Sequence, residues 1–412
     1  MLRNKIGDFL RGGKPFKRKD SVAASSLTSR TLSAKRSRSR NLSSLSTLLN
    51  SKSPRRPCKK SSSKGRNGSL KGSSIINLIL DTYLKSSSFD EKNEQEAITL
   101  LYEAKNCGKE FPCLLSEGVY GAAYQVKNAN HNIIVKLPKS AKMVKGYGKD
   151  TDGFDEWEMK FNQLAYEAIQ RFTMYTFGEN LIAHPLGFWR SPSLTARGFK
   201  QNNFVFVYNF ESSISTYAEL IRTTALSKPD FKSIVFQVLL MLDALQNKVQ
   251  GFCHNDLHGY NMLIKKNDSH ASFSHNLNGE EKTMSGKYVI KLLDFGMCSS
   301  NKHETKDAKR LWRQTRGSPI VDFLMFCNKT LMYASAYNAK TRTYQAWNEE
   351  FLAMLGRIFP PQVIKNGKDT GQWLDQKYLH LDSAEAFTWI KKEFPRDTHP
   401  LATKVLNDSF FR

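Results

Sequence analysis

The segment Gly251-Phe-Cys-His-Asn-Asp-Leu-His-Gly-Tyr-Asn261, followed further along by Lys291-Leu-Leu-Asp-Phe-Gly296, decides how this chain of 412 residues is interpreted. An Asp, an Asn five residues later and an Asp-Phe-Gly beyond a pair of strand-like segments rarely occur together by chance. Phosphoryl transfer gives each residue a task. Asp256 can accept the proton of an attacking hydroxyl, and Asn261 and Asp294 carry the hard oxygen ligands that Mg²⁺ prefers. The two segments therefore predict phosphotransfer chemistry with these three residues as its catalytic set, the last two being metal ligands.

These segments also carry a resemblance to a known family. His254-Asn255-Asp256 resembles the H-R-D catalytic loop of the protein kinases, and Asp294-Phe295-Gly296 resembles their D-F-G motif. The resemblance implies an α+β, two-lobed protein-kinase-like fold, with a small β-rich lobe before a helical lobe. It also implies ATP as the phosphoryl donor and Mg²⁺ as the metal. It covers residues 114–325, about half of the chain.

Residues upstream resemble the nucleotide-binding elements of the same family. Residues 115–124 resemble the glycine-rich loop, in which Gly118 and Gly121 match and Ser116 replaces the first glycine. Ile133-Ile-Val-Lys136 resembles the V-A-I-K strand, so Lys136 is expected to contact the α- and β-phosphates.

The lysine requires a glutamate partner from the next helix. Glu167 is the first choice, because Asn180-Leu-Ile-Ala-His-Pro-Leu-Gly187 downstream resembles the segment that leads into the fourth strand. Glu156 and Glu158 are the alternatives, since they lie nearer the usual separation from the lysine. A polar insertion over residues 140–153 would explain the longer gap to Glu167.

Three departures from the family pattern bear on substrate and regulation. Asn255 replaces the arginine that pairs with a phosphorylated activation loop in many relatives, so we expect activity without that phosphate. His258 stands where serine/threonine kinases usually carry lysine, and His-Asn-Asp-Leu-His also resembles the loop of aminoglycoside and choline kinases. No A-P-E motif follows, and Asp322, which resembles the buried aspartate of helix F, comes only 28 residues after Asp294. The segment that docks peptide substrates is therefore expected to be short.

The favoured hypothesis is a divergent serine/threonine protein kinase, similar to those of large DNA viruses, that acts on a protein substrate. A small-molecule kinase is the first alternative. The second is a pseudokinase scaffold with a nucleic-acid-binding tail, although retention of Lys136, Asp256, Asn261 and Asp294 argues against a pseudokinase.

The charge of the chain is concentrated in its first part. The formal net charge is +24, and residues 1–74 account for +18 of it, with 18 serines and only two aromatic residues. Such a segment buries too little apolar surface to fold, so a disordered tail is expected. Its basic clusters resemble nuclear localisation signals and would also bind nucleic acid or other polyanions.

The remaining composition indicates an intracellular protein. The six cysteines form no C-x-x-C pair, so we expect reduced thiols and no zinc site, and Cys298 is expected to be a packed thiol. The apolar run over residues 234–245 is interrupted by Gln237 and Asp243, and the start Met-Leu-Arg-Asn-Lys has no apolar segment. Neither a membrane span nor a secretory leader is therefore expected.

Beyond the tail, the pattern predicts an N-terminal lobe over residues 75–210 and a C-terminal lobe over residues 211–412. The β-rich part is expected to contain strands within residues 116–126, 132–137 and 204–210 and a helix over residues 157–172. A long helix is expected over residues 230–248. Two short strands, at 262–264 and 288–293, are expected to flank a polar insertion over residues 267–286.

Overall fold

The computed structural model divides the chain between Asn67 and Gly68, and every described residue belongs to the second part. The described residues are 72–84, 91–104, 106, 111–117, 121–138, 156–173, 180–197, 204–211, 215–277, 280–305, 320–359, 364–366, 377–379, 392–393 and 405–412. The expected tail over residues 1–74 therefore lies outside them, apart from its last three residues, which begin helix α2 (Gly72–Leu84).

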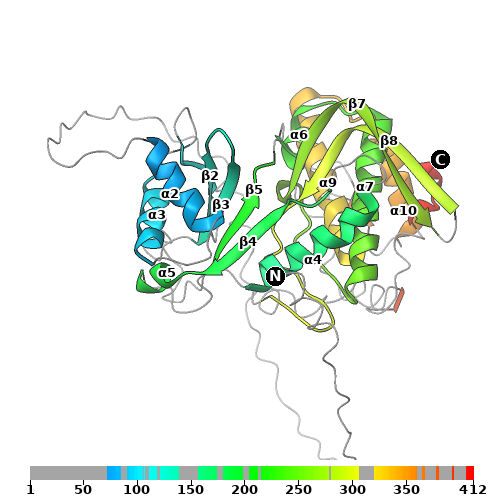
Figure 1. Cartoon of the computed structure of the whole chain (residues 1–412). Coiled ribbons are helices and arrows are strands. Elements are labelled where there is room, and N and C mark those ends of the chain that lie inside the picture. The colour runs from blue at the N-terminus through cyan, green and yellow to red at the C-terminus, as the bar shows by residue number, and fades with distance from the viewer. Residues whose placement is uncertain are drawn as a thin grey trace, which may run out of the picture. The chain divides into compact units, whose positions relative to one another are not determined.

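The first described region is an antiparallel sheet with helices packed beside it (Figure 1). Its strand order is β1-β2-β3-β5-β4. These strands are β1 (Cys113–Glu117), β2 (Gly121–Lys127), β3 (Asn132–Pro138), β4 (Pro185–Arg190) and β5 (Phe204–Asn209). The accompanying helices are α2, α3 (Glu91–Glu103) and the short α5 (Pro192–Ala196). One hydrophobic cluster joins this sheet to α2 and α3 through residues such as Tyr83, Leu101 and Val135.

A larger second cluster joins mostly helices with a three-stranded antiparallel sheet of order β6-β7-β8. Its helices are α4 (Glu156–Thr173), α6 (Tyr217–Thr223), α7 (Lys228–Lys248), α9 (Ile320–Thr341) and α10 (Asn348–Ile358). Its strands are β6 (Ser215–Thr216), β7 (Met262–Leu277) and β8 (Glu280–Leu292), and the short turn η3 (Gly259–Asn261) leads into β7. The remaining elements are β9 (Ile364–Asn366), β10 (Lys377–Leu379) and η5 (Ser409–Phe411).

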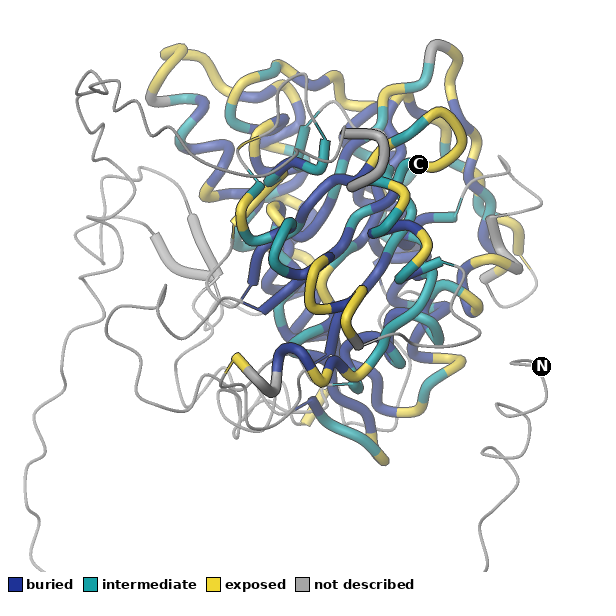
Figure 2. The backbone as a smooth tube through the Cα atoms, turned by 60° about the vertical axis from the view of Figure 1, so that its left-hand side comes forward, coloured by how far each residue is buried: buried dark blue, intermediate teal, exposed yellow. Residues whose placement is uncertain are grey.

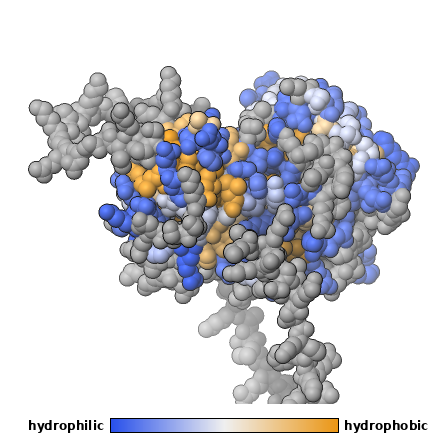
Figure 3. Space-filling view, in the orientation of Figure 1, coloured by the Kyte–Doolittle hydropathy of each residue, from blue (hydrophilic) through white to orange (hydrophobic). Residues whose placement is uncertain are grey.

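The distribution of burial follows these two clusters. Buried backbone runs through the strands and helix interiors, and exposed residues gather at the turns (Figure 2). In the space-filling view, hydrophobic side chains gather over α2 and the five-stranded sheet, and hydrophilic ones cover the side of β7 and β8 (Figure 3). The α+β class expected from the sequence is confirmed by this mixture of helices and antiparallel sheets. The assignment to two kinase lobes with boundaries at residues 74 and 210 stays a prediction.

Most of the expected elements are present with small shifts of their ends. The long helix over residues 230–248 is α7, which begins at Lys228 because Ser227 caps it and Pro229 occupies its first turn. The expected polar insertion at residues 267–286 is wrong, because β7 and β8 continue through it as one long hairpin. Ala271, Phe273 and His275 alternate inward and are buried, so the hairpin has one face in the core.

Two further observations concern the cysteines and membrane spans. Cys298 and Cys327 are buried thiols, but Cys113 is disulfide-bonded, so the expectation of six reduced thiols is wrong at this residue. Spacing along the chain does not reveal such a bond, because it depends on which segments the fold brings together.

Over the residues described, none of the helices has both the length and the apolar character that crossing a bilayer requires.

Candidate phosphotransfer site

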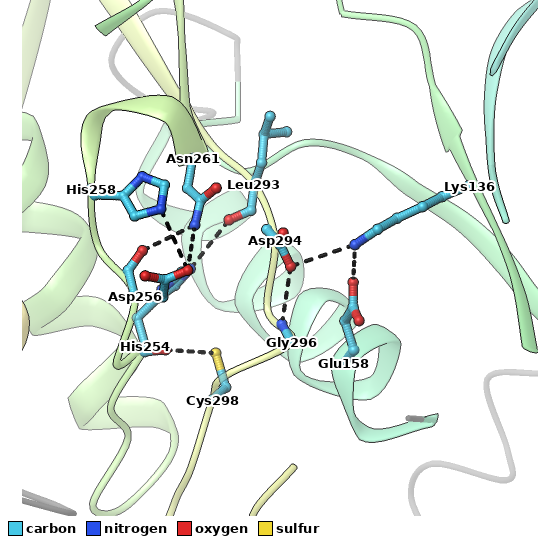
Figure 4. A network of polar contacts seen from close by, with 10 residues as sticks. All are labelled: Lys136, Glu158, His254, Asp256, His258, Asn261, Leu293, Asp294, Gly296 and Cys298. Carbon is cyan, nitrogen blue, oxygen red and sulfur yellow. Dashed lines mark hydrogen bonds and ion pairs between the residues drawn. The ribbon is translucent and has the colours of Figure 1, made fainter. Parts of the chain in front are cut away.

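Strand β3 positions the lysine of the candidate site. Ile133, Val135 and Leu137 are buried in the cluster beneath the sheet, so Lys136 alternates onto the opposite face. There its Nζ donates to Glu158 Oε1 at 2.5 Å and lies 3.5 Å from Asp294 Oδ1 (Figure 4). The ammonium group therefore joins a strand, a helix and the loop that follows β8.

The expected pairing of Lys136 with Glu167 is wrong. Glu158 and Glu167 are nine residues apart on α4, about two and a half helical turns, so they project from opposite faces. Glu158 is 4% exposed, whereas Glu167 is an exposed residue. The other alternative, Glu156, pairs instead with Lys160 at 3.0 Å.

A pattern in the sequence could have identified Glu158. Apolar or small residues follow it at Phe161, Ala165 and Ile169, three, seven and eleven positions later, and all are buried. That spacing marks one helix face, and Glu158 lies at its start. Glu167 lies on the other face, where Gln170 follows three positions later, and both residues are exposed.

Charges around Lys136 stabilise its ionised form. Burial by itself disfavours the ammonium, but the carboxylates of Asp294 and Glu158 outweigh that effect, and the pKa of Lys136 is raised. Burial likewise acts to raise the pKa of Asp294, but Lys136 and the N–H of Gly296 lower it overall. Both groups therefore carry full charge at neutral pH.

The spacing of the two carboxylates favours glycine at position 296. Its N–H donates to Asp294 Oδ1 at 3.3 Å. A Cβ at this residue would lie 3.2 Å from both Asp294 Oδ1 and Glu158 Oε2. A larger side chain would press between the acidic groups that hold Lys136, so the third residue of Asp-Phe-Gly has a local steric reason to be glycine.

The predicted catalytic loop brings Asp256 and Asn261 together. Asn261 Nδ2 donates to the backbone oxygen of Asp256 at 3.0 Å and to its Oδ2 at 3.2 Å. The N–H of Leu293 donates to the backbone oxygen of Asn261 at 2.8 Å, which fixes Asn261 beside the segment that carries Asp294. The amide nitrogen is thus used within the loop, and the side-chain oxygen of Asn261 is left to accept a further partner.

His258 lies against the same carboxylate. Its Nδ1 accepts the N–H of Tyr260 at 3.2 Å, so in the neutral ring Nε2 carries the proton. Nε2 lies 3.5 Å from Asp256 Oδ2. The histidine therefore occupies the position beside the predicted base that lysine occupies in many kinases, and it directs an N–H at that base.

Two buried residues support the loop from behind. Asp322, on α9, accepts the backbone N–H groups of His254 and Asn255, each at 2.7 Å. His254 Nε2 lies 3.2 Å from the Leu293 oxygen, and burial lowers the pKa of this histidine, so a neutral ring donates there. These contacts bear out the expectation that Asp322 is buried, and they give His254 a supporting part beneath the loop.

Asn255 has a role that sequence reasoning did not anticipate. Its backbone is left-handed, with φ of 61°, and its Nδ2 donates to the Met297 oxygen and to Ser299 Oγ, both at 2.9 Å. Cys253 and Ser299 also exchange backbone hydrogen bonds of 2.8 and 2.9 Å. Cys298 is buried within this contact, and burial raises the pKa of its thiol, so it is a packed cysteine.

The predicted nucleotide-loop residues are described only in part. Ser116 is an exposed residue of β1, next to the irregularity in its pairing with β2. Gly121 is buried at the start of β2. Gly118 lies outside the described residues. The structure therefore brings together Lys136, Glu158, Asp256, Asn261 and Asp294, whereas Glu167 lies away from them.

Comparison with known proteins gives one partial similarity. No family model matches the chain. The chain is 31% identical over 141 residues to a protein named "Probable kinase 098L" from Invertebrate iridescent virus 3. The match covers 32% of this chain and 26% of that protein, so it spans about a quarter of the relative's length. Over this part of its length, the chain is thus similar to a viral protein that is named as a probable kinase.

Proposed function

We propose that this protein is an ATP- and Mg²⁺-dependent serine/threonine protein kinase. The observation that carries the proposal is the ion-paired set Glu158–Lys136–Asp294 beside the hydrogen-bonded pair Asp256–Asn261. Phosphoryl transfer needs a cation for the nucleotide phosphates, oxygen ligands for metal and a carboxylate for the acceptor hydroxyl. The name of the viral relative supports phosphotransfer in general, and the choice of a protein acceptor rests on the resemblance of the motifs.

The residues present fit a magnesium–nucleotide complex. Among the described residues, no group of three or more His, Cys, Asp or Glu side chains could hold a metal ion by itself. Magnesium in such sites is held by one or two protein carboxylates together with substrate phosphates, which matches Asp294 with the oxygen of Asn261. When bound, the metal would neutralise the charge of the phosphates. Lys136 would bind the α- and β-phosphates, with Ser116, Gly118 and Gly121 forming the loop above them.

Asp256 is the base in this proposal. Asn261 Nδ2 and the Nε2–H of His258 both face its Oδ2, so the carboxylate has a fixed orientation before any acceptor binds. An acceptor hydroxyl that donates to this carboxylate would have its oxygen directed for in-line attack. The proton of the hydroxyl would pass to Asp256 as the new phosphate ester forms, while the bond between the γ-phosphorus and the bridging oxygen breaks and ADP leaves.

A small-molecule kinase is the second candidate, and His258 favours it. Aminoglycoside and choline kinases resemble this chain at His-Asn-Asp-Leu-His, and the ring of His258 beside Asp256 occupies space that a peptide kinase gives to lysine. Substrate profiling separates the two candidates, because only a protein kinase transfers phosphate to serine or threonine in a polypeptide.

The decisive experiment incubates the purified protein with labelled ATP, Mg²⁺ and either casein or basic proteins. Transfer is expected for the wild type and should be lost in Asp256→Asn and Asp294→Ala. Asp81→Ala, which removes an exposed carboxylate of α2, is the matched control and should retain full activity. Retention of more than about a tenth of the wild-type rate by Asp294→Ala would mean that less than about 1.4 kcal/mol of transition-state stabilisation was lost, and the assignment would be wrong.

A further inference from the structure

A partly exposed arginine lies close to the predicted base. Arg222 is in the last turn of α6, and its guanidinium lies 5.5 Å from the ring centroid of Tyr260 and 5.0 Å from that of Tyr333. Its Nη1 also donates to the hydroxyl of Tyr260. Within the part of the chain that the structure describes, no carboxylate lies within ion-pair distance of this guanidinium. The acidic residue of the same helix, Glu219, accepts instead from the N–H and hydroxyl of Thr216.

The neighbouring tyrosines cannot serve as its counter-ion. Burial raises the pKa of Tyr333 to about 12, so its hydroxyl is neutral at physiological pH. Tyr260 meets the guanidinium through its ring and its hydroxyl, and 43% of this tyrosine is exposed to solvent. Arg222 therefore presents an uncompensated positive charge, partly screened from water by two aromatic rings, at an open surface.

This surface continues to the catalytic carboxylate. The ring of Tyr260 lies 6.1 Å from that of His258, and His258 Nε2 lies 3.5 Å from Asp256 Oδ2. Arg222, Tyr260, His258 and Asp256 thus form one uninterrupted row, which we call the acceptor row. A polypeptide that extends along this row from a hydroxyl at Asp256 would place a neighbouring residue over Tyr260 and Arg222.

The acceptor row is held rigidly from below. Gln345 donates to the oxygens of Ile221 and Thr224 at 3.1 and 2.9 Å, and it accepts the N–H of Leu226 at 3.1 Å. A Cβ on Gly259 would lie 2.6 Å from the Tyr333 ring and 2.8 Å from the Ala218 nitrogen, so η3 packs closely on both α6 and α9. Arg222 and Tyr260 are therefore preorganised for a ligand.

A purely structural role for Arg222 explains less. Arginine near a helix end often binds the last carbonyl groups, but Gln345 binds the oxygen of Ile221 and the Thr224 N–H binds that of Leu220. The cation–π contacts would be retained if the free edge of the guanidinium also bound an anion. Because Nε of Arg222 is buried without a hydrogen-bond partner among the described residues, a carboxylate or phosphate would bind this guanidinium through its Nη groups, and the unfilled requirement is an anionic partner.

We propose that Arg222 and Tyr260 form a subsite for an anionic side chain of the acceptor polypeptide, next to the serine or threonine that receives the phosphate. The inference rests on the proposed kinase function and adds to it a substrate class: acidic or already phosphorylated segments. A lysine or arginine at the same place would face the guanidinium and be repelled.

The test uses peptides that differ only beside a single serine, with flanking aspartate, phosphoserine, alanine or lysine. The wild type is expected to use the aspartate peptide at least about tenfold more efficiently than the lysine peptide, because a hydrogen bond between opposite charges replaces a repulsion between like charges. Preference for the aspartate peptide identifies a carboxylate as the natural anion, and preference for the phosphoserine peptide identifies a phosphate. Arg222→Ala should raise KM for the preferred peptide by about 10- to 100-fold while kcat and KM for ATP stay unchanged.

Matched variants separate this role from general damage. Arg190→Ala is the control, because Arg190 makes a similar contact with Phe204 at 5.7 Å on β4, and its peptide preference should equal that of the wild type. Arg222→Glu should reverse the preference towards the lysine peptide. Equal use of all four peptides by the wild type, or an unchanged preference in Arg222→Ala, would overturn the subsite and leave the kinase activity standing.

Direct binding tests the subsite independently of catalysis. Fluorescence anisotropy with the Asp294→Ala variant should show tighter binding of the aspartate peptide than of the lysine peptide, and addition of Arg222→Ala should remove the difference. Charge-selective binding without transfer to any peptide would support the subsite and overturn the proposed kinase reaction. Binding without charge preference would overturn the subsite.

Discussion

Lys136 lies between the carboxylates of Glu158 and Asp294, and the choice of its glutamate partner depends on which face of α4 is buried. Glu158 shares the buried face with Met159 and Phe161, whereas Glu167 lies on the exposed side. The side chain of Glu158 is only 5% exposed, so solvent screens its ion pair with Lys136 weakly. This contact is therefore expected to hold the lysine for nucleotide binding.

We therefore expect Glu158→Gln to lower kcat/KM for ATP by about 10- to 100-fold, the cost of losing a hydrogen bond between charged groups. Glu167→Gln, the same change on the opposite face of the same helix, should leave kcat/KM within about twofold of the wild type, as is usual for surface substitutions. Steady-state kinetics with ATP as the varied substrate checks both. If the two variants changed kcat/KM for ATP equally, Glu158 would not be part of the nucleotide site.

At the scale of elements, the segment after Asp-Phe-Gly is held between the predicted catalytic loop and α4. Asn255 binds its Met297 and Ser299, and the ring of His303 stacks on Trp157 with centroids 3.8 Å apart. Trp157 precedes Glu158 on α4, so this stack fixes the helix at the residue that matters for Lys136. Neutral contacts thus occupy the place where many kinases use a phosphate bound by arginine.

Treatment with phosphatase is accordingly expected to leave activity unchanged, whereas Asn255→Ala and His303→Ala should each lower kcat/KM by about fivefold. Each loses contacts worth roughly 1 kcal/mol that position α4 or the loop. His303→Phe should restore most of the activity, because it keeps the stack on Trp157. His270→Ala, at an exposed histidine of β7, serves as the control.

Loss of activity on phosphatase treatment, regained by phosphorylation of Ser318 or Thr315, would contradict this account. Those two residues lie outside the described part of the chain.

The hairpin of β7 and β8 is the second element whose role depends on packing. Its polar composition suggested an insertion, but Phe273 is fully buried in the main hydrophobic cluster, and His275 Nε2 lies 3.0 Å from Asp243 Oδ2 of α7. The hairpin therefore covers α7, the long helix behind the catalytic loop, and contributes to the core.

Phe273→Ala should lower the free energy of unfolding by about 3–5 kcal/mol, as for other buried phenylalanines. Ser272→Ala changes the adjacent exposed residue and should alter the free energy of unfolding by less than about 0.5 kcal/mol. Chemical denaturation monitored by circular dichroism measures both. If Phe273→Ala changed the free energy of unfolding only slightly, the hairpin would be a dispensable insertion.

For the whole molecule, the charge is divided between a strongly basic first part and a nearly balanced remainder. A chain that begins at Gly68 retains every described element, so we expect it to keep full phosphotransfer activity. It should elute from heparin at lower salt, because fewer counterions are released on binding, and it should lose nuclear accumulation. Unchanged heparin elution and unchanged distribution in the cell would contradict the proposed role of the tail. Loss of phosphotransfer activity would mean that the activity depends on the tail.

Sequence by itself determined the features that depend on spacing within one segment. These are the loop from His254 to Asn261, the Asp-Phe-Gly that follows β8, the alternation that directs Lys136 away from the core, and the basic composition of the tail. Such features follow from the local period of a strand or loop and need no distant partner. The α+β class followed in the same way, while the catalytic roles of these residues stay predictions.

Tertiary structure decided the features that join segments far apart in the chain. It selected Glu158 over Glu167, continued β7 and β8 through the supposed insertion, involved Cys113 in a disulfide and placed Arg222 beside Tyr260. The physical reason is common to all four. Each outcome depends on which face of an element is buried and what packs against it, and those energies arise only when distant residues come into contact.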